Sequence, residues 1–104
     1  MKTLTLNLII TNGKSLTSIV FALYKSGISE PIFEGDSKES FSRDFNLENN
    51  TEYKLYISGS NPISEKKSTK IKLVYDRFTF HGDFKNPIER RGEGYFIKYA
   101  FNSN

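Results

Sequence analysis

The feature that most constrains this chain is the regular alternation of apolar and polar residues in several short segments. In residues 51–58, TEYKLYIS, the residues Tyr53, Leu55 and Ile57 fall at every second position. Successive side chains of a β-strand point to opposite faces, so this spacing predicts a strand with one buried face. The same alternation in KTLTLNLII near the start and GYFIKYAFN near the end predicts strands there as well.

Residues 15–27 fit two patterns. Their apolar residues also recur at helical spacing, with Ser15 in the position of a cap and Gly27 in that of a stop. We favour a strand, because Val, Ile, Phe and Tyr dominate the segment. No charged residue occurs between Ser15 and Tyr24 to supply the polar face that a surface helix needs.

Further strands are expected at residues 31–34, at an edge, and at 41–47. Another is expected to start at residue 69 and to run on through 78–80. Turn residues at 59–62 are expected to end the strand that precedes them. Seven or eight short strands joined by Gly, Asn, Pro and Ser turns indicate an all-β fold. It would be an antiparallel two-sheet sandwich of Greek-key or prealbumin-like type, with residues 1–104 as one domain.

The runs NGKSLTSIVFALY, IFEG, FSRDFNL and NTEYKLYISGSNP resemble the Cna-B family of prealbumin-like (transthyretin-like) sandwiches, over about residues 4–62. In that family a turn of the type NGKPL precedes a strand containing FxLY. The resemblance implies the fold. It does not imply the isopeptide crosslink of many Cna-B domains. Lys2 precedes the alternation of the first strand, and Val20 precedes Phe21 where the family often has Glu.

The chain has few of the residues on which catalytic and metal sites depend. The chain has no cysteine, which removes disulfides, thiolate nucleophiles and cysteine-bound metals. His81 is the only histidine and would need Asp76 and Asp83 to complete a metal site; we interpret it as a solvated polar residue, with any further role left open. We therefore expect a protein that is not an enzyme and that uses neither metal nor cofactor.

Two other motifs have a plainer interpretation. GKS at residues 13–15 resembles the end of a phosphate-binding loop, but the required upstream glycine is replaced by Leu8 inside an apolar strand. Asn12-Gly13 predicts a β-turn instead. A group of acidic residues offers oxygen ligands for Ca²⁺, but in no known loop spacing, and we interpret it as solvated charge. The group is Glu34, Asp36, Glu39 and Asp44.

Basic residues are concentrated in the last third of the chain. Residues 1–64 contain six Lys and Arg against seven Asp and Glu, whereas residues 65–104 contain nine against five. One hypothesis is a positive face that binds phosphates of nucleic acid, or a small nuclease that adds His81 and Lys98. The alternative is that strand lysines prevent edge-to-edge aggregation. The residues of the positive face would be Lys66, Lys67, Lys70, Lys72, Arg90 and Arg91.

Tyr56 falls opposite the buried residues of its strand, and Tyr24 is expected to face outward in the same way. Two exposed tyrosines can form a platform for a protein partner or a sugar ring, or they can pack under loops. The function we expect first is protein–protein contact or self-association, including strand addition at the edge near residues 30–35. Carbohydrate binding through the tyrosines is the second hypothesis and nucleic-acid binding the third.

No segment is long and apolar enough to insert into a membrane, and the first ten residues lack the continuous apolar block of a secretory signal. These features predict a cytoplasmic protein, with export by a non-classical route left open.

Overall fold

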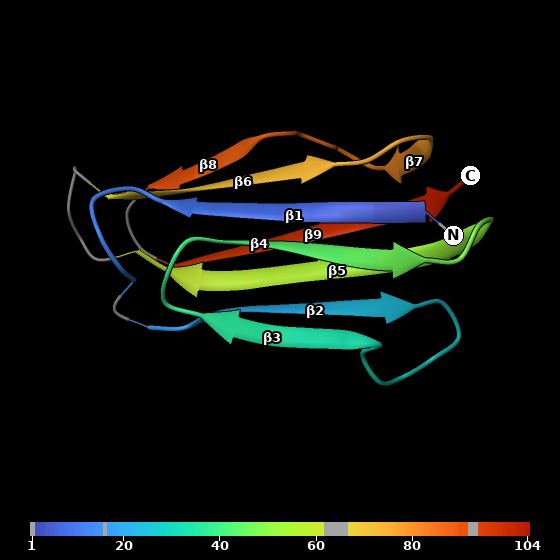
Figure 1. The fold of residues 1–104 in the computed structure, drawn as a ribbon, viewed down its shortest axis with the longest axis horizontal. Coiled ribbons are helices and arrows are strands. Elements are labelled where there is room, and N and C mark those ends of the chain that lie inside the picture. Colours follow the sequence, from blue (N-terminus) through green and yellow to red (C-terminus); the bar gives the residue numbers. More distant parts are fainter. Residues whose placement is uncertain (1, 16, 62–66, 92–93) are drawn as a thin grey trace.

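Two antiparallel β-sheets stacked face to face make up the fold (Figure 1) of a computed structural model that describes residues 2–15, 17–61, 67–91 and 94–104. These residues form the strands β1 (Lys2–Ile10), β2 (Ile19–Lys25), β3 (Phe33–Ser37), β4 (Phe41–Leu47), β5 (Thr51–Ser60), β6 (Ser68–Val74), β7 (Phe78–His81), β8 (Ile88–Arg91) and β9 (Gly94–Ser103).

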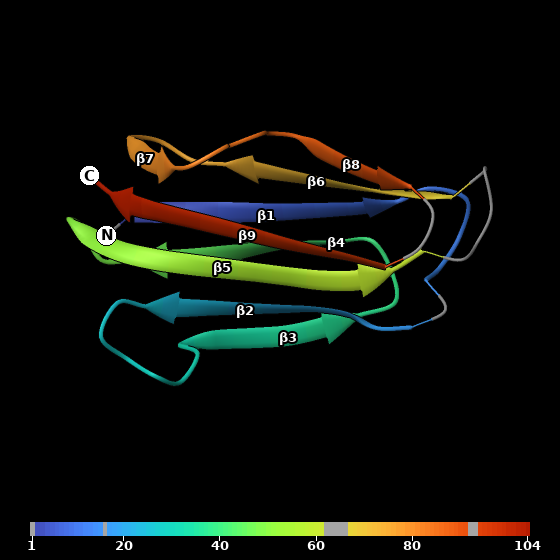
Figure 2. The ribbon, with the colours of Figure 1, turned by 180° about the vertical axis from the view of Figure 1, so that it is seen from behind.

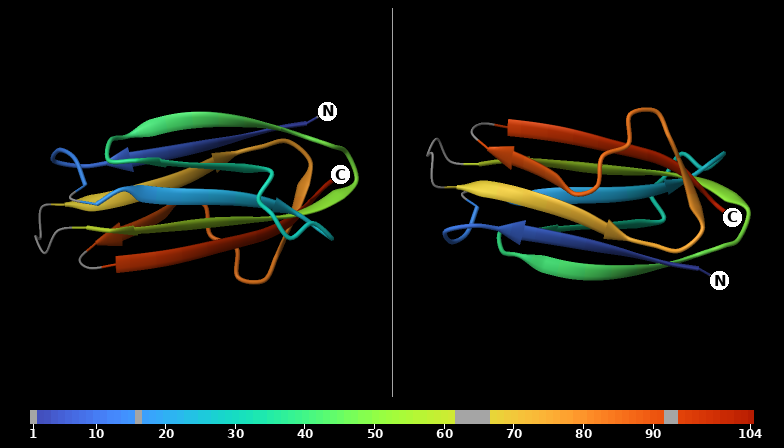
Figure 3. Two further views of the ribbon diagram at one scale, coloured as in Figure 1. Left: turned by 90° about the horizontal axis from the view of Figure 1, so that it is seen from below. Right: turned by 90° about the horizontal axis from the view of Figure 1, so that it is seen from above.

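One sheet has four strands in the order β4-β1-β6-β8, and the other has five in the order β3-β2-β5-β9-β7. Every strand pair is antiparallel. The five-stranded sheet is nearer the viewer in Figure 2, and the edge-on views of Figure 3 show the two layers. The predicted all-β antiparallel sandwich is confirmed. The segment at 15–27 that fitted both patterns contains a strand, β2.

The core lies between the sheets and is built by the alternation itself. The buried residues of β1, β5 and β9 fall at every second position, while the residues between them face outward. Full burial of one such side chain stabilises the fold by about 1.5–3 kcal/mol. The fully buried aliphatic residues are Leu4, Leu6, Leu8, Ile19, Leu23, Leu47, Leu55, Ile57 and Ile71.

The strand count differs from the expected seven or eight, since the described residues contain nine. The segment expected to run on from residue 69 through 80 is two strands that lie in different sheets. Arg77, with a φ of 59°, lies in the left-handed region between them and redirects the chain. β8 was not expected, because Ile88 is its only apolar residue. It forms by pairing with β6, where Ile88 lies opposite Ile71.

The strand ends inside the segment 59–62, where a break was expected, but two residues later than predicted, because β5 continues through Gly59 and Ser60. These two residues pair with Tyr95 and Gly94 of β9, so the ladder extends to the end of the sheet. A Cβ added to Gly59 would lie 2.5 Å from the hydroxyl of Tyr95 and 2.7 Å from its Cζ. The glycine therefore gives room to an aromatic ring and does not end the strand.

Aromatic side chains close the open side of the sandwich between β7 and β8. The rings of Phe80 and Phe84 stack with their centroids 3.8 Å apart, and Phe78 stacks on Phe101 at 5.5 Å. Tyr75 contacts Phe80 at 4.7 Å. Segment 82–87, expected as a plain turn, thus contributes Phe84 to the core margin.

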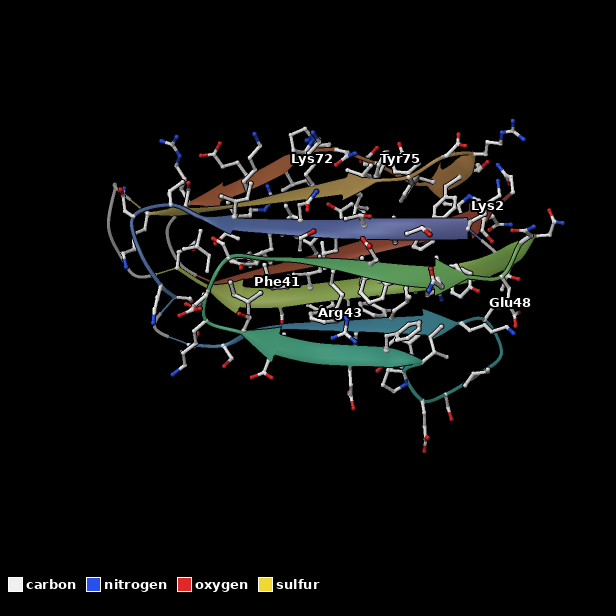
Figure 4. All side chains as sticks on the ribbon, in the orientation of Figure 1. Lys2, Phe41, Arg43, Glu48, Lys72 and Tyr75 are labelled. Atoms are coloured by element: carbon white, nitrogen blue, oxygen red, sulfur yellow. The ribbon has the colours of Figure 1, made fainter. Side chains whose placement is uncertain are left out.

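The opposite open side lies between β3 and β4 and is closed differently. Figure 4 shows Phe41 and Arg43 on the side of β4 that faces β3. The guanidinium of Arg43 lies 5.3 Å from the ring centroid of Phe21 and 5.9 Å from that of Phe45. A charged side chain therefore covers core aromatics at this edge.

Both ends of the chain lie at the same end of the sandwich (Figures 1 and 3). β1 starts there and β9 finishes there, in different sheets.

Candidate binding face

The outer side of the five-stranded sheet carries an apolar surface made of Val20 and Tyr24 on β2, Tyr56 on β5 and Phe96 on β9. We call these four residues the aromatic face. Phe96 is 66% exposed and Val20 is 47% exposed, whereas the two tyrosines are half-buried. Strand register brings the residues together, since Ala22 lies opposite Tyr56 and Ser58 lies opposite both Val20 and Phe96.

The three rings of the aromatic face touch in sequence. Tyr24 and Tyr56 meet edge to face, with centroids 5.6 Å apart and planes at 83°. Tyr56 and Phe96 are 5.7 Å apart with planes at 37°. Edge-to-face contact is a favourable arrangement for aromatic pairs, so the rings hold one another in place. The rings therefore form one connected surface that is not flat.

A groove of about 590 Å³ lies along the three rings of the aromatic face, and Val20 does not line it. Ala22 is the small residue among its larger neighbours Tyr24 and Tyr56, and the loop residue Ile28 lines one part of it. Glu52 and Lys54 line it as well and supply opposite charges. The groove thus combines apolar walls with a few polar groups, as binding clefts do.

Charge is distributed unevenly across the aromatic face. Glu34 and Asp36 are exposed on β3, at one edge of the sheet. Lys98 is exposed on β9, on the other side of Tyr56. The apolar surface therefore lies between an acidic edge and a basic strand.

The basic residues expected to form one positive face are divided. Lys70, Lys72 and Arg91 lie on the outer side of the four-stranded sheet, where Figure 4 shows Lys72. Arg90 lies opposite Thr69, whose side chain is buried, so it is on the inner side at the sheet margin. Lys67 donates a hydrogen bond to the carbonyl of Lys14 at 3.1 Å. Lys66 lies outside the described residues.

The acidic residue Glu89 lies among the basic residues on the outer side of the four-stranded sheet. Glu89 is opposite Lys70 on β8 and accepts from Arg91 at 3.2 Å. Hydrogen bonds from Arg91 and from Ser68, together with the charges of Arg91 and Lys70, lower the pKa of Glu89. Glu89 therefore stays ionised and offsets part of the positive charge.

The GKS segment is a turn. Asn12 and Gly13 have φ values of 59° and 111°, both in the left-handed region that such turns require. Lys14 forms an ion pair with Glu39 at 2.7 Å. This hydrogen-bonded pair raises the pKa of Lys14 and lowers the pKa of Glu39.

The residues considered for metal binding do not converge. Within the described ranges no group of three or more His, Asp and Glu is close enough to hold an ion. His81 is exposed and its Nε2 lies 3.0 Å from Oδ1 of Asn102. Of the four acidic residues, Asp44 on β4 accepts a hydrogen bond from Thr5 of the neighbouring strand β1 at 2.7 Å, whereas Glu34 and Asp36 lie on β3 in the other sheet.

Sequence reasoning identified Tyr24 and Tyr56 but did not single out Val20 and Phe96. The alternation in β9 does place Phe96 opposite the buried Tyr95 and Ile97, which is a usable signal. Its position beside Tyr56 depends on the pairing of β5 with β9, and no local pattern specifies that register.

The described residues contain no helix of the length and apolar character needed to cross a membrane. Comparisons of the chain with protein-family models, curated proteins and solved structures found no match.

Proposed function

We propose that this chain is a non-enzymatic binding module that holds a protein partner against the aromatic face. The observation that carries this proposal is the contact of the three rings of Tyr24, Tyr56 and Phe96 on the sheet surface that also exposes Val20, with Phe96 mostly in water. Single exposed apolar residues are common, but contiguous apolar patches rimmed by polar residues mark interaction sites. Large aromatic residues dominate the energetic centres of protein interfaces.

The sheet edges favour this face over strand addition, because the edge strands are short or charged. β3, the edge expected to accept a strand, carries exposed Glu34 and Asp36 on its outer side. β4 turns Arg43 inward, and β7 and β8 have four residues each. Such features oppose the pairing of a further strand.

Carbohydrate binding is a second candidate, favoured by the groove that Tyr24 and Tyr56 both line. A sugar ring stacks on the flat side of an aromatic ring. The 83° angle between these two rings leaves no common plane for adjacent sugars. A protein side chain that inserts into the groove places no such demand on the rings, and for this reason we rank a protein partner first.

A matched pair of variants tests the proposed function. Val20 on the aromatic face and Val74 on the opposite face are 47% and 49% exposed. The immobilised chain is used to capture proteins from a lysate of the cells that produce it. We expect Val20→Asp to reduce the captured protein at least about tenfold, because the change puts a charge into the apolar surface that the partner would cover. Val74→Asp should capture as much as the wild type. Equal capture by the two variants would contradict the proposal.

The carbohydrate candidate has its own pair of variants. On a glycan array, binding that Tyr56→Ala abolishes and Tyr56→Phe keeps would support sugar stacking. An array without signal, or a signal that both variants retain, would remove this candidate.

A further inference from the structure

We propose that the partner held on the aromatic face is a second copy of this chain, which packs face to face about a two-fold axis parallel to the strands, between β2 and β5. This inference rests on the proposed function and specifies its partner. The observations that carry it are the order of the charges across the sheet and the size of the face.

One row of residues crosses the sheet in register. Glu34 pairs with Ala22, Ala22 with Tyr56, and Tyr56 with Lys98. The row therefore reads acid, small, aromatic, base. Side chains of such a row share the outer face, about 4.8 Å apart from strand to strand.

The reversed row is complementary to itself. A two-fold axis between β2 and β5 exchanges the two inner strands and the two outer strands of the row. It places Glu34 over the partner's Lys98 and Ala22 over the partner's Tyr56. Each contact occurs twice. The acid meets a base, and the ring of Tyr56 meets the small residue that lines the groove.

The row on the side of Tyr24 supports the same axis, whereas the row on the other side places Asp36 over the partner's Phe96 and Val20 over the partner's Ser58. Tyr24 on β2 lies opposite Lys54 on β5, so the axis places Tyr24 over the partner's Lys54. A cation over an aromatic ring is attractive. An axis moved by half a strand spacing onto β5 would place Lys54 over its own copy, and like charges across an interface disfavour association.

The face is large enough for such an interface. The molecule measures 41 × 24 × 21 Å along its principal axes, and Figure 2 shows the five-stranded sheet across the two longer dimensions. A stable interface of standard size buries about 800 Å² on each partner. Sheets that pack face to face keep their strands within about 30° of one another, which an axis along the strands allows.

Sedimentation equilibrium tests the inference on the wild-type chain and on charge variants. We expect the wild-type mass to rise from 12.0 kDa toward twice that value as concentration increases. Glu34→Lys and Lys98→Glu should each weaken association at least about tenfold, because each change places like charges together twice. The double variant Glu34→Lys/Lys98→Glu exchanges the charges and should restore the wild-type dissociation constant to within about threefold.

Lys72→Glu is the matched control, since it makes the same charge change on the outer side of the four-stranded sheet. It should associate as the wild type does. Urea midpoints of all variants verify that each is folded.

The outcomes separate this inference from the proposed function. A wild type that stays monomeric up to about 1 mM overturns the second copy as partner. The inference is also overturned if the double variant Glu34→Lys/Lys98→Glu associates as weakly as the single variants do. If Val20→Asp still abolishes capture of other proteins in either case, the proposed function stands. If Val20→Asp changes neither self-association nor capture, both fail.

Discussion

Gly59 shows how a single residue sets the packing of a whole strand end. It lies on β5 opposite Tyr95, and a Cβ there would also come within 3.0 Å of Cγ1 of Ile19. Ile19 and Tyr95 are both buried, so neither can move without disturbing the core.

We therefore expect Gly59→Ala to lower the free energy of unfolding by about 1–3 kcal/mol through overpacking. Urea denaturation measures the change. Gly94→Ala, in the adjacent pair of the same ladder, is the control. Among the described residues, a Cβ at Gly94 meets only the backbone oxygen of Gly59 at 3.6 Å, which is ordinary contact. Equal losses in the two variants would contradict the role of the Tyr95 ring.

Tyr99 makes stability depend on pH in the alkaline range. It is 3% exposed, and its hydroxyl has no hydrogen-bond partner among the described residues. Burial raises the pKa of Tyr99 to about 12, an effect that the charge of Arg90 reduces in part. The folded state therefore holds this proton more tightly than the unfolded state, whose tyrosine pKa is about 10.

The stabilising contribution of Tyr99 is complete below about pH 10 and is lost as pH rises toward 12. Its full size is about 2–3 kcal/mol. Urea midpoints measured from about pH 8 to pH 12 should fall less steeply for Tyr99→Phe than for the wild type. All other ionisable groups are the same in both proteins, so the difference between the two curves isolates Tyr99. Parallel curves would refute the prediction.

At the scale of single elements, β4 combines an edge position with an inward charge. Arg43 lies over Phe21 and Phe45, and Gly35 of β3 fits beneath Phe21, since a Cβ there would lie 2.7 Å from Cζ of that ring. An inward-facing charge at an edge prevents the strand from pairing with another molecule.

Arg43→Val should therefore increase aggregation on mild heating, while it changes the free energy of unfolding by only about 1 kcal/mol. Light scattering measures the aggregation. Arg43→Lys keeps the charge and should remain as soluble as the wild type. A soluble valine variant would show that other features protect this edge.

The strands also differ in whether a short stretch of sequence is enough to predict them. Alternation predicts β1, β5 and β9 with the correct buried faces, because strand periodicity is a property of each residue and its neighbours. β8 depends on its partner β6, and one isoleucine gives no periodic signal. The sequence pattern also does not predict that the chain passes from one sheet to the other at Arg77, since apolar residues continue on both sides of it.

The candidate site is divided in the same way. Alternation places Tyr24 and Tyr56 on the outer side of their strands. The contact of Tyr56 with Phe96, and the order of charges from Glu34 to Lys98, come from the pairing of strands that lie far apart in the chain. Short stretches of sequence show that these residues are aromatic or charged and which side of the strand they occupy. They do not show that the residues lie next to one another in the folded sheet. The resemblance to Cna-B domains over about residues 4–62 stays a prediction.

For the molecule as a whole, strand position predicts an order of local opening. β1 and β5 lie inside their sheets and pair with neighbours on both sides, whereas β3, β4, β7 and β8 are edges. We expect the paired amides of β1 and β5 to exchange with solvent at least about 100-fold more slowly than those of β3 and β7. Hydrogen exchange followed by NMR measures this. Uniform rates over all strands would contradict it.

The shared end of the sandwich at which the chain starts and finishes has a mechanical consequence. A pull applied at Lys2 and Asn104 would load β1 and β9 from that one end. The hydrogen bonds between these strands and their neighbours would then break one after another from that end. Under shear, by contrast, all of them would carry the force at the same time. A molecule of this topology should yield to a small stretching force, however stable it is toward heat.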